Sequence, residues 1–233
     1  MQIAIEHRPA RGRPEQLVLL LHGWAQEAQA MAPLADALLR EFPQAAVCVP
    51  QAPMPADGGR PGGMWYSIEG LREDPGLWPQ RVAAQLDALE PWVRAQQQRL
   101  GVAAPATCLA GFSQGGLLAL ELVARHDGLA GRVLAFGSRY CTLPELAPQH
   151  STLHFLHGRD DAIFTLADVQ QAFGHLAQRR ADATLDVAHG VGHELHPALI
   201  ECALQRLRTH IPRRTWEEAL GGVPVRADAC PNH

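Results

Sequence analysis

Short runs of apolar residues recur along the 233-residue chain, separated by longer segments in which apolar positions follow a helical spacing. Each run has the length of a strand, and turn-forming residues flank several of them. An alternation of buried strands with amphipathic helices is typical of a mainly parallel sheet whose two faces are covered by helices. The pattern therefore predicts an α/β fold with strands at 17–21, 45–49, 106–110, 132–136, 152–156 and 183–187.

Three of the intervening segments carry an apolar stripe at helical spacing. Residues 28–39 place Met31, Leu34 and Leu38 on one face, which predicts a helix there. Residues 78–93 repeat the pattern, and Pro91 within them predicts a kink. A last helix is expected around residues 199–207, begun by Pro197 in its first turn.

Residues 50–63 interrupt this alternation with four prolines and four glycines, and they are predicted to form an irregular loop. The loop leads into Met64, Trp65 and Tyr66. Long irregular loops in compact domains often have a function, although a solvent-exposed loop anchored by its aromatic residues is the alternative. After Pro212 the chain is predicted to contain an amphipathic turn at 216–220 and a polar end that frays.

The composition is that of one globular domain. With 47% hydrophobic residues the chain can bury a sizeable core, and we expect a single domain over residues 1–212 followed by a tail over 213–233. A net charge of −4 with mixed signs offers no basic face for nucleic acid. The first residues lack a secretory signal and no segment is long enough to cross a membrane, so a cytoplasmic location is expected. Five cysteines without C-x-x-C spacing favour free thiols over disulfides or a structural zinc site.

The candidate chemistry centres on Gly111-Phe112-Ser113-Gln114-Gly115, a G-x-S-x-G sequence. It follows the apolar strand predicted at 106–110 and precedes a run of helix formers at 117–124. A chain that reverses between strand and helix so abruptly strains the serine and leaves no room for side chains at the two glycines. The motif predicts a serine hydrolase with Ser113 as its nucleophile, against the alternative of a Gly/Ser loop without chemistry.

A serine nucleophile needs a base, and the base needs an acid that orients it. Two carboxylates, Asp160 and Asp161, follow the fifth predicted strand, and three histidines, His189, His193 and His196, follow the sixth. Ser, then Asp, then His is the chain order of α/β-hydrolases. Spacing favours His193, which follows a glycine on a turn before the last helix, over the other two histidines. Spacing alone leaves both carboxylates open, with Asp161 preferred.

Two further histidines are expected to have structural roles. His22 directly ends the first predicted strand, and we expect it to fix the turn that presents the Trp24 amide. That amide and the Gln114 amide would then form an oxyanion hole. His157 is expected to be structural as well.

These motifs resemble the phospholipase/carboxylesterase family, which includes acyl-protein thioesterases, and especially its bacterial esterase branch. The similar positions, within about residues 17–210, are Leu20-Leu21-His22-Gly23, Pro50-Gln51-Ala52-Pro53, Gly63-Met64-Trp65-Tyr66, Gly111-Phe112-Ser113-Gln114-Gly115-Gly116, His157-Gly158-x-x-Asp161 and Gly192-His193. The resemblance implies an α/β-hydrolase fold. It also implies that Ser113 is the nucleophile, Asp161 the orienting acid and His193 the general base. The same resemblance assigns the oxyanion hole to the backbone amides of Trp24 and Gln114.

The chain departs from the family pattern at two places. The family commonly has Leu-Gly-Asp where this chain has Trp24-Ala25-Gln26, and Trp-Phe-Asp where it has Trp65-Tyr66-Ser67. A bulky Trp24 beside the oxyanion hole is expected to alter the acyl pocket. We expect short to medium acyl chains to be preferred, because large side chains would surround the acyl group. These side chains are Trp24, Met64, Trp65, Tyr66 and Phe164.

The leading hypothesis is a serine carboxylesterase or thioesterase that hydrolyses small acyl esters through an acyl-enzyme, with no cofactor and no metal. The sequence does not decide between a monomer and a homodimer. One alternative is a peptidase of the same fold, which is disfavoured because no cap or propeller domain is present to select peptides. A second alternative is a non-catalytic protein that holds a ligand in the hydrolase pocket. It is disfavoured because the serine and the histidine both remain.

Overall fold

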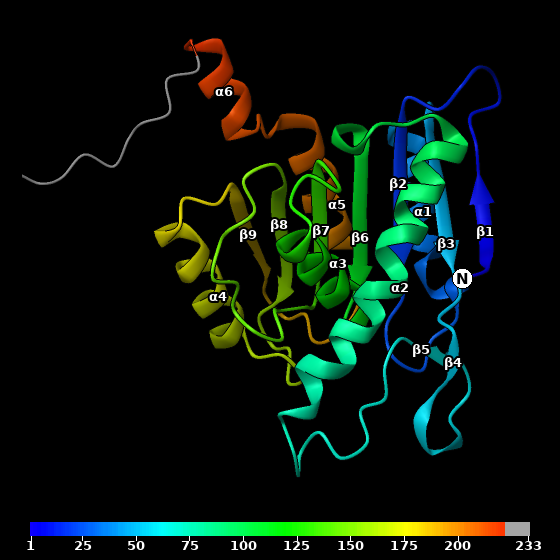
Figure 1. Ribbon diagram of the computed structural model, residues 1–233, viewed down its shortest axis with the longest axis vertical. Helices are drawn as coiled ribbons and strands as arrows, with labels where there is room; N and C mark the ends of the chain where they lie inside the picture. The colour runs from blue at the N-terminus through cyan, green and yellow to red at the C-terminus, as the bar shows by residue number, and fades with distance from the viewer. Residues whose placement is uncertain (222–233) are drawn as a thin grey trace, which may run out of the picture.

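The computed structural model describes residues 1–221, and a seven-stranded sheet forms its centre (Figure 1). The strands are β1 (Ile3–His7), β2 (Gln16–Leu21), β3 (Ala45–Pro50), β6 (Thr107–Phe112), β7 (Arg132–Phe136), β8 (Thr152–Gly158) and β9 (Ala183–Ala188). Six of them run parallel in the order β3-β2-β6-β7-β8-β9, and β1 pairs antiparallel with β3 at one edge. The six parallel strands are those that the sequence predicts, so the mainly parallel sheet is confirmed.

The edge strand β1 is not predicted from the sequence. Its residues are half-buried or exposed, because the strand has a neighbour on one side only. The pairing register also shifts between Ile3 and Ile5, and the two isoleucines pack against the cores on opposite faces of the sheet. An irregular, half-exposed edge strand lacks the alternation by which strands are recognised.

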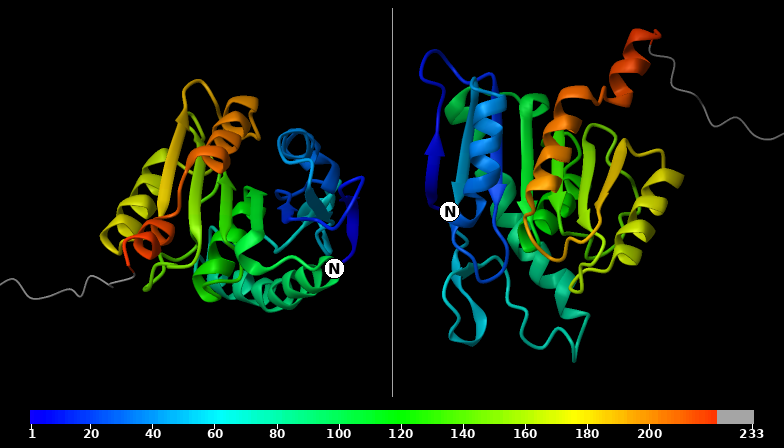
Figure 2. Two further views of the ribbon diagram at one scale, coloured as in Figure 1. Left: turned by 90° about the horizontal axis from the view of Figure 1, so that it is seen from above. Right: turned by 180° about the vertical axis from the view of Figure 1, so that it is seen from behind.

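Helices cover both faces of the sheet, as expected (Figure 2). Helices α1 (Ala32–Glu41) and α5 (Pro197–Thr209) pack on one face. Helices α2 (Leu77–Leu100), α3 (Gln114–Arg125) and α4 (Leu166–Gln178) pack on the other. Each face has its own hydrophobic core, and apolar side chains from alternate positions of the strands enter the two cores in turn.

Two details of the helices differ from the sequence predictions. The segment predicted at 28–39 starts as a 3-10 turn, Ala28–Met31, and α1 begins after it with Pro33 in its first turn. Helix α2 includes Pro91 and continues to Leu100, beyond the end predicted at residue 93. Pro91 is exposed, so water can replace the backbone hydrogen bond that the proline removes. Trp92 and Val93 beside it are buried, so the opposite face of the helix still packs against the core.

The prediction that residues 50–63 have no regular structure is wrong in part. Strand β4 (Met54–Pro55) pairs antiparallel with β5 (Gly63–Met64), and a 3-10 turn, Asp57–Gly59, connects them. Gly58 and Gly59 both adopt positive φ, at 66° and 67°, which allows the chain to reverse. The segment is therefore a short ribbon that projects beyond the carboxyl ends of the parallel strands (Figure 1).

At the carboxyl-terminal end of the described chain, the amphipathic turn predicted at 216–220 is part of a short helix, α6 (Arg213–Ala219). The polar end that is predicted to fray lies outside the described residues. None of the helices within residues 1–221 is both long enough and apolar enough to cross a membrane.

Candidate active site

Ser113 stands at the turn between β6 and α3, at the carboxyl end of the sheet. Its backbone has φ 54° and ψ −117°, a conformation that costs a side-chain-bearing residue free energy. The two glycines of the motif make the turn possible. A Cβ atom on Gly115 would lie 2.0 Å from the Leu21 carbonyl oxygen, and one on Gly111 would lie 2.3 Å from the backbone of Gly115. The sequence G-x-S-x-G is thus required by the close approach of β2, β6 and α3.

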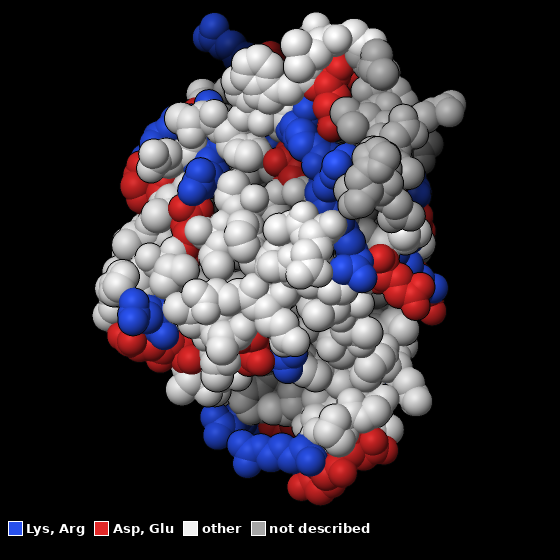
Figure 3. Space-filling model, turned by 90° about the vertical axis from the view of Figure 1, so that its left-hand side faces the viewer, with Lys and Arg blue, Asp and Glu red and all other residues white. Residues whose placement is uncertain are grey.

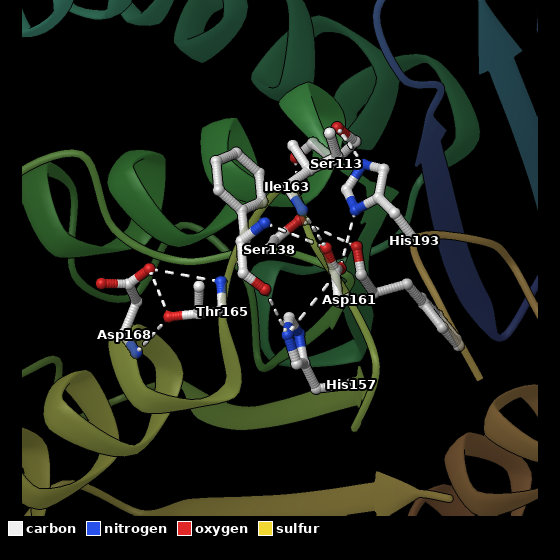
Figure 4. A network of polar contacts seen from close by, with 10 residues as sticks. Ser113, Ser138, His157, Asp161, Ile163, Thr165, Asp168 and His193 are labelled. Carbon is white, nitrogen blue, oxygen red and sulfur yellow. Dashed lines mark hydrogen bonds and ion pairs between the residues drawn. The ribbon is translucent and has the colours of Figure 1, made fainter. Parts of the chain in front are cut away.

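Ser113, His193 and Asp161 form one chain of hydrogen bonds, although they come from three separate loops (Figure 4). The Ser113 hydroxyl donates to Nε2 of His193 over 2.9 Å, and Nδ1 of His193 donates to Oδ2 of Asp161 over 2.7 Å. These are the distances of good hydrogen bonds. The carboxylate at one end fixes the histidine tautomer, so that Nε2 faces the hydroxyl as an acceptor.

The Asp161 carboxylate is fully buried, and hydrogen-bond donors of the protein replace water around it. Its Oδ1 accepts hydrogen bonds from the backbone amides of Ile163 and Phe164, at 2.8 and 2.9 Å. Burial alone would raise the pKa of Asp161, but the hydrogen bonds from His193 and Phe164 outweigh it and the pKa lies below its usual value. Asp161 is therefore a carboxylate at neutral pH.

The other candidate acids and bases lie away from Ser113. His189 is exposed, and the Nδ1 atom of His196 accepts a hydrogen bond from the Ala198 amide at the start of α5. Asp160 is exposed, and its backbone amide donates to the Val191 carbonyl. His193 and Asp161 are thus the members of each group that are brought to the serine.

His157 lies in the floor of the site, completely buried in β8. Its Nε2 donates to the Phe164 carbonyl over 2.8 Å and lies 3.8 Å from Oδ2 of Asp161. Burial lowers the pKa of His157, so the ring is neutral at neutral pH. The contact holds the loop whose amides bind Asp161.

His22 is buried at the end of β2 and connects two loops. Its Nδ1 donates to the Gly23 carbonyl over 2.8 Å, and its Nε2 accepts from the Ala52 amide over 3.0 Å. Burial lowers the pKa of His22, which keeps the ring in this neutral form. The turn that follows contains Trp24, whose backbone amide donates to no group within residues 1–221. Ala25 completes the turn with a positive φ of 56°.

The side chain of Gln114 makes contacts that the sequence does not predict. Its Oε1 accepts from the Trp65 amide at 3.1 Å, and its Nε2 donates to the Tyr66 carbonyl at 2.8 Å. The primary amide thus pairs with the backbone of the segment after the ribbon, as a neighbouring strand would. Its own backbone amide, at the first position of α3, is left free by the helix geometry.

The expected acyl-pocket residues are only partly available to a ligand. The side chains of Met64, Trp65 and Tyr66 are 7%, 0% and 2% exposed, so Trp65 and Tyr66 belong to the core beneath the site. The Trp65 indole donates to the His22 carbonyl there. Trp65 and Tyr66 thus offer almost no surface to an acyl group, and we correct the expectation that they line the pocket. Trp24 and Phe164 are half-buried and present surface.

Aromatic rings flank the His193 imidazole. The Phe112 ring centre lies 4.9 Å from the imidazole centre, and the Phe164 ring meets the imidazole edge-on at 5.7 Å. Phe164 in turn stacks on Trp78, with the guanidinium of Arg139 over both rings. Trp78 and Arg139 are further residues that the sequence does not indicate. On the side that carries α4, the surface is hollowed near the carboxyl ends of the strands, with arginine and acidic side chains at the rim (Figure 3).

The chain is similar to known esterases over most of its length. The sequence model of the phospholipase/carboxylesterase family matches residues 5–211. The esterase YpfH of Escherichia coli K12 is 37% identical over 212 residues, which cover 89% of this chain and 88% of that protein. Among solved structures, esterase PE8 superposes with a TM-score of 0.80 at 23% identity, over 88% of this chain and 96% of its own. The carboxylesterase of Bacillus cereus superposes with a TM-score of 0.70 at 16% identity, over 86% and 91% of the two chains.

Proposed function

Because the chain belongs to the phospholipase/carboxylesterase family and has its α/β-hydrolase fold, we propose that it is a serine carboxylesterase that works through an acyl-enzyme. The family is one of esterase-type hydrolases, and the proposal adds the residues that perform the reaction. The observation that carries it is the continuous hydrogen-bonded chain from Ser113 through His193 to Asp161.

The proposed reaction begins with the Ser113 hydroxyl. His193 removes its proton through Nε2 as the oxygen attacks the ester carbonyl, and Asp161 stabilises the imidazolium that forms. His193 then protonates the leaving alcohol, which departs and leaves the acyl group on Ser113. Water activated by the same histidine hydrolyses the acyl-enzyme and restores the serine.

The negative charge on the carbonyl oxygen needs donors during both steps. We assign these to the backbone amides of Trp24 and Gln114, which no other hydrogen bond within residues 1–221 uses. The Gln114 amide is also at the positive end of the α3 dipole, which favours an anion there. His22 and the Gln114 side chain hold the two segments in place.

The proposed substrates are small acyl esters, with thioesters of the same acyl groups as a second class. Of the side chains expected in the acyl pocket, Trp24 and Phe164 are half-buried, and we expect them to limit the acyl chain to short or medium length. These two side chains do not specify the alcohol part of the ester.

A fluorophosphonate probe and a Ser113→Ala variant test the proposal together. The probe should label the wild-type chain at Ser113 once, and the variant should lose labelling together with at least ~10³-fold in ester turnover while keeping its fold. Turnover of an ester but not of the matching amide would exclude a peptidase. A chain that binds esters, resists the probe and hydrolyses nothing would instead be the ligand-binding protein.

A further inference from the structure

Within residues 1–221, one arginine beside the proposed triad has no acidic partner. Arg139 follows Gly137 by two residues, in the loop after β7, the strand next to that which carries Ser113. The approach is close, since a Cβ atom on Gly137 would lie 3.4 Å from Nδ1 of His193. Arg139 therefore lies at the same edge of the sheet as the proposed triad.

Aromatic rings connect the Arg139 guanidinium with the imidazole of His193. Its central carbon lies 4.8 Å from the centre of the Trp78 ring and 5.5 Å from that of Phe164. The Phe164 ring meets His193 edge-on at 5.7 Å, so a single ring separates the cation from the base. Packing against the two rings restricts the orientation of the guanidinium, whose Nε atom is buried without a hydrogen-bond partner.

The hydrogen-bonding capacity of the guanidinium is largely unused. No carboxylate within residues 1–221 lies within 4.0 Å of it, and its one hydrogen bond is a long one, 3.4 Å, from Nη1 to the Tyr140 carbonyl. Glu121, which approaches the same loop, is engaged by the amides of Cys141 and Thr142. The Nη2 amine is neither bonded nor buried. By contrast, Arg206 makes a two-pronged pair with Asp186.

We propose that Arg139 binds a carboxylate of the substrate, so that the enzyme prefers esters that carry a negative charge near the scissile bond. This rests on the proposed esterase function. A guanidinium on aromatic faces is poorly hydrated and binds carboxylates with two parallel hydrogen bonds. The guanidinium carbon lies no further from the His193 ring than the sum of 5.5 and 5.7 Å. An acyl chain of about six carbons, at ~1.2 Å per bond, ends in a carboxylate within reach.

The experiment compares charged and neutral esters of equal carbon length. On the acyl side the pair is monomethyl adipate and methyl hexanoate, and on the alcohol side it is 3-butyryloxypropanoate and propyl butyrate. Acid release in a pH-stat gives kcat/KM for each. The pair that responds to Arg139 identifies the side of the ester bond on which the carboxylate lies.

Two variants at Arg139 and one control separate charge from packing. Arg139→Met keeps a long side chain against the rings and removes the charge, and Arg139→Lys keeps the charge. Arg159→Met is the control, because Arg159 is an exposed arginine at the same sheet edge that makes no ion pair within residues 1–221. It removes the same charge from the surface without touching the stack.

The expected result is a loss of ~10-fold or more in kcat/KM for one charged ester in Arg139→Met, with the neutral esters changed less than ~3-fold. Arg139→Lys should recover part of the loss, and Arg159→Met should behave as the wild type. Equal losses for charged and neutral esters, no loss for either, or an equal effect of Arg159→Met would overturn the inference. If the wild type hydrolysed neutral esters but no charged ester, the inference about Arg139 would be overturned and the proposed esterase function would be retained. If the wild type hydrolysed no ester, both proposals would be refuted.

Discussion

The hydroxyl of Ser138 donates to the backbone carbonyl of Ser113 over 2.8 Å. The same hydroxyl is 2.9 Å from the Phe136 carbonyl, so a residue of the β7 loop connects the strained nucleophile turn with the neighbouring strand. The fit is tight, because a Cβ atom on Gly116 would lie 2.2 Å from this hydroxyl. Ser138 is thus a support for the unusual backbone of Ser113.

Ser138→Ala should lower both stability and turnover. Loss of a buried hydrogen bond costs about 1 kcal/mol of unfolding free energy, and a less constrained Ser113 should reduce kcat several-fold with KM nearly unchanged. The matched control is Ser151→Ala. Ser151 donates to the Ala130 carbonyl over 2.7 Å at the opposite end of β8. It should lose similar stability, measured by urea unfolding, and no kcat. Equal kcat values for both variants would show that Ser138 has no role in positioning Ser113.

The acid of the proposed triad gives a second test. Asp161→Asn removes the charge that stabilises the imidazolium and sets its tautomer, so kcat should fall by ~10²–10⁴. Asp160→Asn, which alters an exposed neighbour, should change kcat less than ~2-fold. Steady-state kinetics on one short ester suffices. A severe effect of Asp160→Asn with a mild one of Asp161→Asn would reverse the assignment.

A feature of the site can be predicted from the sequence when the residues that form it are adjacent in the chain. The strand-turn-helix around Ser113 is predicted because its strand, glycines and helix are adjacent in the chain. The candidate acids and bases follow strand ends, and parallel strands bring their carboxyl ends together, so the sequence predicts that these groups meet at one edge of the sheet. The choice of His193 over its neighbours depended on loop geometry. The roles themselves stay predictions until the variants are measured.

The parts of the site that sequence reasoning misses depend on contacts between distant segments. The Gln114 side chain binds backbone atoms nearly fifty residues away, and such partners have no sequence signature because every residue has an amide and a carbonyl. The stack of Trp78, Phe164 and Arg139 joins α2 with the loops after two strands. The sequence places Trp65 in the pocket because aromatic residues beside a loop are found both in pockets and in cores, and only the packing distinguishes the two.

The Gln114 side chain provides the third prediction. Gln114→Met keeps the size and the backbone amide but leaves the buried Tyr66 carbonyl and Trp65 amide without partners. We expect a loss of about 1–3 kcal/mol in stability and a ~10-fold or larger fall in kcat, since the segment after the ribbon shifts over the site. Gln97→Met is the control, because Gln97 makes similar buried bonds to Leu129 and Thr107 far from Ser113. It should lose stability only. Unchanged kcat in both would limit Gln114 to a structural role.

His154 makes stability depend on pH. It is fully buried in β8, and burial, assisted by the charge of Arg132, lowers its pKa from 6.5 to about 3. Above pH 6.5 the ring is neutral in both the folded and unfolded states. Below pH 6.5 His154 is protonated in the unfolded chain, whereas in the folded chain it stays neutral until about pH 3. Stability is therefore lost as the pH falls through this range.

The fourth prediction follows from this sign. In His154→Gln the slope of unfolding free energy against pH should be smaller than in the wild type, by at most ~1.4 kcal/mol per pH unit. Urea unfolding between pH 7 and pH 5 measures it. His189→Gln replaces an exposed histidine and should retain the wild-type slope. Parallel curves for the wild type and His154→Gln would mean that His154 is protonated in the folded protein.

The last prediction concerns acyl length and Trp24. Its ring is half-buried, with the guanidinium of Arg60 5.4 Å from the ring centre, and its backbone belongs to the turn that we assign to the oxyanion hole. We expect this large side chain to lie beside the reacting carbon, where it would leave little volume for a long acyl chain. Trp24→Leu removes most of the ring without changing the backbone amide. It should therefore enlarge the acyl space and preserve the proposed oxyanion donor.

Each methylene that the enlarged pocket admits is worth ~0.8 kcal/mol, or about 4-fold in kcat/KM, whereas one that clashes gains nothing. The wild type should have its optimum among short to medium p-nitrophenyl esters, and Trp24→Leu should move it to longer chains in the series from acetate to palmitate. Trp216→Leu, in the exposed helix α6, is the control for tryptophan removal and should keep the wild-type optimum. A wild-type optimum at palmitate would show that no bulky wall confines the acyl chain. An unchanged optimum in Trp24→Leu would assign that wall to Phe164 instead, because Phe164 is the other expected pocket residue with substantial exposed surface beside His193.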